Sequence, residues 1–318
     1  MAASARRSSI IAAGAAAACA GLALLAAACD LTGDPPANSG PFDDSGAPGV
    51  GAEIGSGVGG CGAERVSLGT NNVAVETAGA RRAALIYVPH TYNPERPAPV
   101  LLSFHRAGST ATSHRAYANF IPQSEQAGFL LVLPYADINV GSWRTTVGAR
   151  ADVEFIEDLL AGMTEDLCVD SERIYAAGFS DGAVFAHLLA CSGTRLAGLA
   201  VVALQRTDPC PAARPLAAIG FHGTADSVEP YDAVHPDEWA EGWAQTNGCD
   251  VVPIGIPGSA EVRTSLWTNC IEGAPVAFYT LDGGGHTWPG ADSMDALGPT
   301  IGAVDASVEI TRFFGLIE

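Results

Sequence analysis

Short apolar runs alternate along most of the chain with longer segments in which apolar residues recur at helical spacing. The runs that predict buried strands occupy residues 83–89, 99–105, 129–135, 173–179, 196–204, 216–223 and 275–282. The predicted helices occupy residues 116–128, 151–167, 181–191, 237–248 and 304–317. Strands that are apolar throughout and alternate with helices are typical of a mostly parallel sheet with helices on both faces. We therefore predict an α/β fold.

The composition predicts one large domain preceded by a segment with few large apolar residues. Hydrophobic residues make up 48% of the 318 residues and charged residues 16%, which is enough apolar material for a sizeable core. Residues 30–60 are rich in Gly, Pro, Ser and Asp and contain few large apolar residues, which predicts a flexible tether. We expect a single catalytic domain at residues 61–318, with no large lid domain.

The first 29 residues have the features of an export signal. Arg6 and Arg7 precede an apolar stretch at residues 10–28 that is rich in alanine and leucine and ends at Cys29. Cleavage after a small-residue A-x-A site would release the protein. The segment also resembles a bacterial lipoprotein signal, in which Cys29 becomes the lipidated first residue, although Ala26 stands where leucine is usual. We favour lipidation, and hence a cell-envelope lipoprotein, over free secretion and over a retained membrane-spanning helix.

The charge balance excludes one class of partner. The formal net charge is −19, and all 16 basic residues are arginine. A surface this acidic repels phosphate backbones, so we expect no nucleic-acid binding. Contact with a membrane is expected only through the N-terminal lipid anchor.

Six cysteines follow the tether: Cys61, Cys168, Cys191, Cys210, Cys249 and Cys270. An even number in an exported chain predicts disulfide bonds, and six cysteines allow 15 pairings. No C-x-x-C pair occurs, so we expect no structural zinc. No G-x-G-x-x-G follows an early strand, which argues against a nucleotide-dependent redox function. We therefore expect neither a metal nor a cofactor.

The strongest chemical signal is the G-x-S-x-G spacing of Gly178, Ser180 and Gly182. It lies between the predicted strand 173–179 and the predicted helix 181–191. This strand–turn–helix context is what a nucleophile elbow requires, because the turn is tight and the helix packs closely on the strand. We predict that Ser180 is a catalytic nucleophile and not merely a turn serine.

A serine hydroxyl needs a base to accept its proton and an acid to orient that base. In α/β-hydrolases the chain order is Ser, then Asp or Glu, then His. His286 follows three glycines just after the predicted strand 275–282, and we assign it as the base. Asp226 follows the predicted strand 216–223 and is assigned as the acid. The other reading of His286 is an idle residue of a glycine-rich turn.

Other polar residues near these positions leave alternatives open. Asp232 and Asp237 are alternative acids, although they lie further from the strand end than Asp226. His222 is expected to have a structural role at the end of its strand. His235 lies in a predicted loop, and His187 is too close to Ser180 along the chain to serve as its base.

The developing oxyanion also needs backbone donors. We expect one from the N–H of Asp181, and another from the N–H of Arg106 or Ala107 after the predicted strand 99–105. His105 is expected to stabilise that loop.

Two tryptophans lie close in sequence to these elements. Trp143 and Trp288 would either form the wall of a pocket for an aromatic acyl group or a sugar, or pack in the core. The sequence favours neither reading.

Several stretches together resemble the exported poly(3-hydroxybutyrate) depolymerase and feruloyl esterase family of α/β-hydrolases. They are "VDSERIYAAGFSDGA", "GFHGTADSVEPY", "WAQTNGC", "GGGHTWPG" and "VDASVEITRFF". The resemblance covers residues 61–318 and is most specific at "GGGHTWPG". It implies Ser180 as nucleophile, Asp226 as acid and His286 as base, an ester substrate, and no metal or organic cofactor.

The chain departs from the family at one position. The family usually has His-Gly where this chain has His105 and Arg106. An arginine there would strain the oxyanion loop or place a cation beside the substrate, because glycine permits backbone angles that other residues avoid. The resemblance also ranks the disulfides and favours Cys168 with Cys191 and Cys249 with Cys270. Cys61 would then pair with Cys210.

The expected substrate is a soluble or oligomeric ester, because no further domain for adsorption to solid polymer is seen after the last predicted helix. Feruloylated or acetylated polysaccharide fragments and short hydroxyalkanoate oligomers are the candidates. Two other functions remain open. One is a serine peptidase on the same fold, because the triad does not distinguish esters from amides. The other is a catalytically impaired surface-binding module, which Arg106 alone suggests.

Overall fold

The computed structural model of the protein describes residues 52–53, 60–62, 67–137, 140–145, 150–205 and 214–318. The expected signal at residues 1–29 with its lipidation site Cys29, nearly all of the tether, and Cys210 lie outside the described residues. Within the described part of the chain, no helix is both long and apolar enough to cross a membrane.

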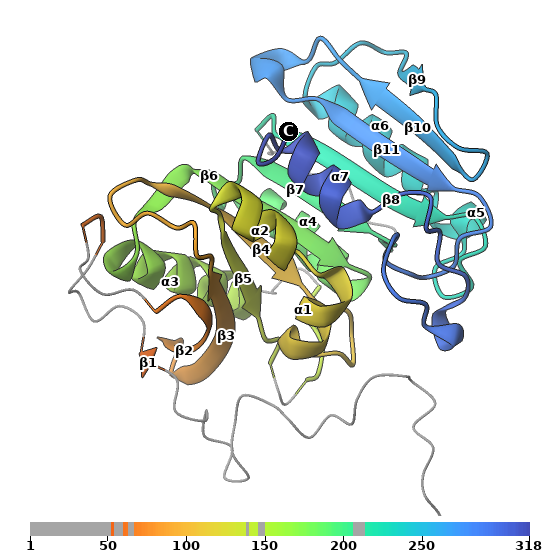
Figure 1. Cartoon of the computed structure of the whole chain (residues 1–318). Coiled ribbons are helices and arrows are strands. Elements are labelled where there is room, and N and C mark those ends of the chain that lie inside the picture. The colour runs from red at the N-terminus through yellow and green to blue at the C-terminus, as the bar shows by residue number, and fades with distance from the viewer. Residues whose placement is uncertain (1–51, 54–59, 63–66, 138–139, 146–149, 206–213) are drawn as a thin grey trace, which may run out of the picture. The chain divides into compact units, whose positions relative to one another are not determined.

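The described strands form one sheet in the order β1-β2-β3-β5-β4-β6-β7-β8-β11-β10-β9 (Figure 1). Their bounds are β1 Ala52–Glu53, β2 Gly69–Thr77, β3 Ala80–Val88, β4 Ala98–Phe104, β5 Leu130–Pro134, β6 Val169–Phe179, β7 Gly198–Val202, β8 Ala217–Gly223, β9 Ile254–Ile256, β10 Val262–Trp267 and β11 Val276–Leu281. Neighbours from β5 through β4, β6, β7 and β8 to β11 are parallel. Strands β3 and β10 join this block antiparallel at either side. The mostly parallel sheet is confirmed.

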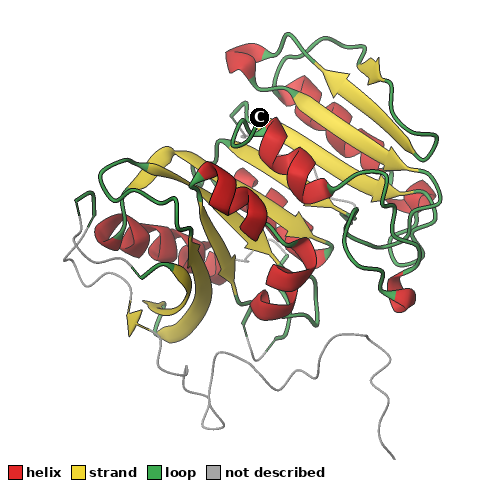
Figure 2. Cartoon of the chain, in the orientation of Figure 1, coloured by secondary structure: helices red, strands yellow, loops and turns green. Residues whose placement is uncertain are grey.

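Helices cover both faces of the sheet, as Figure 2 shows. Their bounds are α1 Ala111–Ala118, α2 Ile121–Ala127, α3 Arg150–Asp166, α4 Asp181–Cys191, α5 Tyr231–Val234, α6 Pro236–Thr246 and α7 Ala306–Phe313. One apolar cluster joins the sheet to α3, α4 and α6. A second cluster joins the opposite face to α1, α2 and α7. The α/β fold, with a mostly parallel sheet and helices on both faces, is therefore confirmed.

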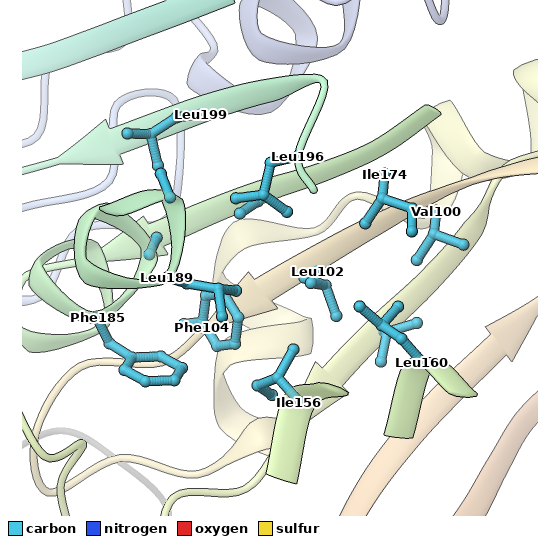
Figure 3. Close-up of a cluster of buried hydrophobic side chains, with 14 of the residues drawn as sticks. Val100, Leu102, Phe104, Ile156, Leu160, Ile174, Phe185, Leu189, Leu196 and Leu199 are labelled. Atoms are coloured by element: carbon cyan, nitrogen blue, oxygen red, sulfur yellow. The ribbon is translucent and has the colours of Figure 1, made fainter. Parts of the chain in front are cut away.

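Strand β4 shows why the central strands are apolar throughout. Its side chains alternate between the faces, so Leu102 and Phe104 enter one cluster and Leu101 enters the other. Figure 3 shows Phe104 beside Phe185 of α4, and their rings meet edge to face with centroids 5.0 Å apart. A strand buried on both faces has no solvent side on which polar residues would be stable. The largely apolar run is the consequence, and its one polar residue, Ser103, has a buried partner in His114.

The predicted helix 116–128 is wrong in one respect, because two helices occupy this region. Helix α1 ends at Asn119, whose left-handed φ of 43° and ψ of 55° stop the helix. Helix α2 then begins at Ile121 with Pro122 in its first turn, where a missing N–H costs nothing. Strands β1, β2, β9 and β10 were not predicted from the sequence, and β1 lies within the predicted tether, where it pairs with β2. Polar residues interrupt β2 and β10, and β9 is short and exposed.

Two disulfides are described, and they correct part of the expected pairing. Cys249 pairs with Cys270, as the family resemblance implied. Cys61, however, pairs with Cys168, so the expected pairs Cys168–Cys191 and Cys61–Cys210 are wrong. Cys191 is disulfide-bonded as well, but not to Cys168.

The reason for the Cys61–Cys168 pairing lies in the loop between β3 and β4. The N–H of Gly62 donates to the Pro94 carbonyl at 2.7 Å, which brings the chain at Cys61 to this loop. Cys168 reaches the same loop, because its N–H donates to the Tyr92 hydroxyl at 2.8 Å. Contacts between segments that are distant in the sequence therefore decided the pairing.

Candidate active site

Ser180 occupies a sharp turn between β6 and α4. Its φ of 54° and ψ of −119° are unusual for a residue with a side chain, and such a conformation costs about 1–3 kcal/mol. The surrounding backbone holds it in place. The Ser180 N–H donates to the Val202 carbonyl at 2.9 Å, and the Ser180 carbonyl accepts the N–H of Ala183 at 2.9 Å at the start of α4. Strain at this turn is typical of a nucleophile elbow.

The two glycines of G-x-S-x-G are required by close backbone contacts. A Cβ on Gly178 would lie 2.1 Å from the Gly182 carbonyl oxygen. A Cβ on Gly182 would lie 2.3 Å from the carbonyl oxygen of Phe104 at the end of β4. Neither backbone atom can move without displacing a strand or the helix, so the motif spacing follows from how tightly α4 packs on β6 and β4.

His286 lies on a loop after β11, and this loop packs against the end of β8. A Cβ on Gly223 would lie 2.1 Å from the Gly284 carbonyl oxygen, so the two segments touch through their backbones. The His286 N–H donates to the Leu297 carbonyl at 2.7 Å, and the Gly285 N–H donates to the Pro299 carbonyl at 2.8 Å. These bonds fix the loop so that the imidazole faces Ser180.

Ser180, His286 and Asp226 form a continuous hydrogen-bonded relay. His286 Nε2 lies 2.8 Å from Ser180 Oγ, and His286 Nδ1 lies 2.8 Å from Asp226 Oδ2. With Nδ1–H donating to the carboxylate, Nε2 is left to accept from the serine hydroxyl. The three residues follow β6, β8 and β11, whose carboxyl ends share one edge of the sheet. The residues that the sequence analysis selected are therefore brought together by the parallel topology.

Asp226 is positioned through its second carboxylate oxygen. Oδ1 accepts the N–H of Val228 at 2.9 Å and the N–H of Glu229 at 2.8 Å. Burial alone raises the pKa of Asp226. The hydrogen bond and charge of His286, together with the Glu229 N–H, outweigh burial and hold this pKa below its usual value. Asp226 is therefore ionised at neutral pH and can orient the imidazole.

His222 lies next to Asp226 but outside the relay. Its Nε2 is 2.9 Å from the Glu229 carbonyl and 3.5 Å from Asp226 Oδ2. Burial lowers the pKa of His222, which favours the neutral ring. The alternative residues His235, Asp232 and Asp237 are exposed.

The loop after β4 is held by His105. The His105 Nδ1–H donates to the Arg106 carbonyl at 2.8 Å, and Nε2 accepts the N–H of Ala136 at 3.1 Å. Burial lowers the pKa of His105 to about 4, so its ring is neutral. In the part of the chain that the structure describes, no backbone carbonyl accepts a hydrogen bond from the N–H of Asp181 or Ala107.

Arg106 does not strain this loop, which corrects one expectation from the sequence. It is absent from the non-glycine residues with positive φ, and the left-handed conformation falls instead on Gly108, with φ of 70°. The Arg106 side chain folds back, and Nη1 donates to the Ala107 carbonyl at 3.1 Å. Arginine is accommodated because the residue that needs glycine's freedom lies two positions later.

Trp143 and Trp288 are both buried in the core. Trp143 is 2% exposed and stacks on Phe185, with ring centroids 4.6 Å apart. Trp288 is 1% exposed, and its Nε1–H donates to Ser307 Oγ at 3.0 Å. Indoles this deeply buried present little surface to a substrate, so of the two readings, core packing fits the structure.

Sequence reasoning missed a buried ionic cluster beside the site. Asp152 is 0% exposed, and its Oδ1 lies 2.7 Å from Arg82 Nη1. Arg144 also contacts Asp152, at 3.4 Å, and pairs with Asp137 at 2.7 Å. A signal was present in the sequence, because Asp152 precedes the buried residues of α3 by three and four positions and so lies on the face that enters the core.

Among the described residues, no cluster of three or more His, Cys, Asp or Glu side chains is arranged to hold a metal ion.

No protein-family model matches the chain. Its sequence is 29% identical over 218 residues to the protein named "Probable feruloyl esterase C" from Aspergillus flavus, covering 65% of this chain and 77% of that protein. It is 28% identical over 212 residues to feruloyl esterase C from Emericella nidulans, covering 64% and 76%. Among solved structures, the acetyl xylan esterase from Aspergillus awamori aligns with a TM-score of 0.56 at 16% identity, covering 74% of this chain and 94% of that one.

The structural likeness supports the fold, and the sequence relatives support the kind of enzyme. The chain therefore has an α/β-hydrolase fold and is similar in sequence to feruloyl esterases, which supports a carboxylic-ester hydrolase.

Proposed function

We propose that this protein is an exported serine esterase that uses Ser180 as nucleophile, His286 as base and Asp226 as orienting acid. The observation that carries the proposal is the relay itself, in which His286 lies 2.8 Å from both partners. An ionised Asp226 stabilises the imidazolium that forms when His286 accepts a proton. The intact relay argues against a catalytically impaired binding module.

The reaction proceeds in two steps. Ser180 Oγ attacks the ester carbonyl carbon while its proton passes to His286 Nε2. The resulting oxyanion accepts hydrogen bonds from the N–H of Asp181 and from that of Arg106 or Ala107. As the intermediate collapses, the bond to the alcohol breaks and the alcohol leaves with the proton from His286. Water, deprotonated by His286, then attacks the acyl-enzyme. The bond between the acyl carbon and Ser180 Oγ breaks, Ser180 takes the proton back from His286, and the acid is released.

The proposed substrates are feruloyl or acetyl esters of polysaccharide fragments, or short hydroxyalkanoate oligomers. Sequence relatives named as feruloyl esterases favour the first of these. The experiment is a hydrolysis panel on the purified protein with p-nitrophenyl acetate, p-nitrophenyl butyrate, methyl ferulate, acetylated xylan and a soluble hydroxybutyrate oligomer. An anilide of the preferred acid tests the peptidase alternative.

Each substrate is tested beside two variants. Ser180→Ala should abolish cleavage with little change in thermal stability, because the hydroxyl contributes little to the fold. Ser259→Ala, at an exposed serine, is the matched control and should retain wild-type rates. No cleavage of any ester by folded wild-type protein would contradict the proposal, as would full activity in Ser180→Ala.

Export is supported by the disulfides Cys61–Cys168 and Cys249–Cys270, since such bonds persist in oxidising compartments. We further propose that Cys29 carries a lipid that anchors the exported protein to a membrane. Incorporation of labelled palmitate in a bacterial host tests this, with Cys29→Ala as the comparison. Equal labelling of both, or labelling of neither, would contradict the anchor.

A further inference from the structure

Trp143 bonds to both backbone segments that carry the proposed oxyanion donors. Its indole Nε1–H donates to the carbonyl of His105, the residue before Arg106, at 2.9 Å. Its backbone N–H donates to the side chain of Asp181, the residue after Ser180, at 2.8 Å. One residue outside the relay therefore connects the loop after β4 to the first turn of α4.

The indole is held so that this connection is rigid. Its ring stacks on Phe185 of α4 with centroids 4.6 Å apart and an interplanar angle of 10°. It also meets the edge of Phe104 at the end of β4, with centroids 5.2 Å apart. A buried aromatic ring between two others has no space to change rotamer, so the direction of the indole N–H is fixed by packing.

The segment around Trp143 is held by the buried ionic cluster of Arg82, Asp137, Arg144 and Asp152. The Arg144 N–H donates to Asp152 Oδ2 at 2.8 Å, and the Arg144 guanidinium pairs with Asp137 at 2.7 Å. Arg82 also pairs with Asp152, with Nη1 2.7 Å from Oδ1. Removing one partner from a buried ionic group is strongly unfavourable, so the cluster holds the backbone on both sides of Trp143.

The same segment also contacts the oxyanion loop directly. The Gly108 N–H donates to the Gly141 carbonyl at 3.0 Å. The Ala136 N–H donates to Nε2 of His105 at 3.1 Å. Together with the indole bond, these contacts join Ala136, Gly141 and Trp143 to residues 105–108 at three points.

We propose that Trp143 is a positioning residue that sets the separation of the two oxyanion donors by tying the His105 carbonyl and the Asp181 carboxylate to one rigid segment. This inference rests on the proposed function. Donors stabilise the transition state only when they lie about 2.7–3.1 Å from the oxyanion. A shift of about 1 Å in such a group can cost on the order of 100-fold in rate. Trp143 therefore acts on kcat without touching the substrate.

The test separates binding of the transition state from binding of the ground state. Trp143→Phe keeps an aromatic ring but removes the indole N–H together with the pyrrole ring that carries it, so variants of Asp181 serve to separate the hydrogen bonds from the packing. The first measurement is kcat and KM on p-nitrophenyl butyrate. The second is inhibition by a short alkyl trifluoromethyl ketone, whose carbonyl carbon bonds to Ser180 Oγ. The hydroxyl proton passes to His286, and the ketone oxygen becomes an oxyanion in the site.

The variant is expected to lower kcat by roughly 10- to 100-fold and to weaken the ketone by a similar factor, with KM nearly unchanged. Asp181→Ala removes the other bond and should show the same pattern. Asp181→Asn keeps an oxygen that accepts the Trp143 N–H, so its kcat and its affinity for the ketone should lie close to the wild-type values. This rescue keeps the proposal testable even if Trp143→Phe fails to fold.

Trp239→Phe is the matched control. It removes an indole hydrogen bond to His187 Nδ1, 3.2 Å long, that does not involve the oxyanion loop, and it should leave kcat and ketone binding unchanged. The proposal is overturned if folded Trp143→Phe keeps wild-type kcat and ketone affinity, or if Asp181→Asn is as impaired as Asp181→Ala. Activity that survives in Ser180→Ala would instead overturn the proposed function itself.

Discussion

The Nε2 atom of His286 lies 2.8 Å from the Ser180 hydroxyl, although 106 residues separate the two along the chain. The contact exists because β6 and β11 run in the same direction in one sheet and end at the same edge. The imidazole is oriented for this contact from its other side, by Asp226.

Asp226→Asn should lower kcat on the order of 10⁴-fold. The asparagine oxygen would still accept the N–H groups of Val228 and Glu229, so its NH2 group would face His286 Nδ1. The proton of His286 would then lie on Nε2 and point toward Ser180, leaving no atom to accept the serine proton. Steady-state kinetics on p-nitrophenyl butyrate measures the loss. Asp232→Asn, at an exposed acid of α5, is the control, and an equal loss there would refute the assignment.

Gly182→Ala should destabilise the protein by about 3 kcal/mol or more. The new Cβ would lie 2.3 Å from the Phe104 carbonyl oxygen, and neither the strand nor the helix can yield. Gly242→Ala in α6 is the matched control, because its Cβ would meet nothing within 4 Å. It should stabilise the protein by about 0.5–1 kcal/mol. Urea denaturation measures both, and equal effects would show that the elbow can relax.

Arg106→Gly should not raise kcat, because Arg106 is free of the backbone strain that glycine would relieve. The added freedom of the unfolded chain should instead lower stability by about 0.5–1 kcal/mol. Arg106→Ala removes the same side chain without adding backbone freedom to the unfolded chain, so it serves as the comparison. Steady-state kinetics measures kcat of both variants, and urea denaturation measures their free energies of unfolding. A rise in kcat for Gly but not for Ala would show that the oxyanion loop is strained after all.

The protein should lose stability on acidification partly through His114. Burial is the main reason that its pKa falls to about 3, and the neighbouring His105 and Arg106 lower it further. The unfolded chain binds this proton near pH 6.5, whereas the folded chain does not. The stabilising contribution is therefore present above pH 6.5 and is lost as the pH falls toward 3.

His114→Gln removes this titration while keeping a polar group toward Ser103, with which His114 Nε2 makes a 2.9 Å contact. Between pH 6.5 and 4.5, the wild type should lose about 2 kcal/mol of stability relative to the variant, since each pKa unit corresponds to about 1.4 kcal/mol and the unfolded histidine is already half protonated at pH 6.5. Urea denaturation at both pH values measures it. His235→Asn, at an exposed histidine, is the comparison variant. A constant difference for His114→Gln would mean that its pKa is ordinary.

Local features of the chain were readable because they depend on neighbouring residues. The apolar runs at β4, β5 and β7 predicted these strands correctly, because a strand buried on both faces requires apolar residues along its own length. The glycines around Ser180 predicted the nucleophile elbow, because they are required by the tight turn between the strand and the helix. The order of Ser180, Asp226 and His286 along the chain then sufficed to select the residues that the parallel sheet brings together.

Features that depend on distant partners were not readable. The partner of Cys168 was decided by where residues 60–62 meet the loop before β4. The role of Trp143 was decided by Phe185 on one side and by His105 and Asp181 on the other. The spacing of residues along a chain carries the geometry of one turn, strand or helix. Only the packed sheet determines which side chains from separate elements lie within 3 Å of one another.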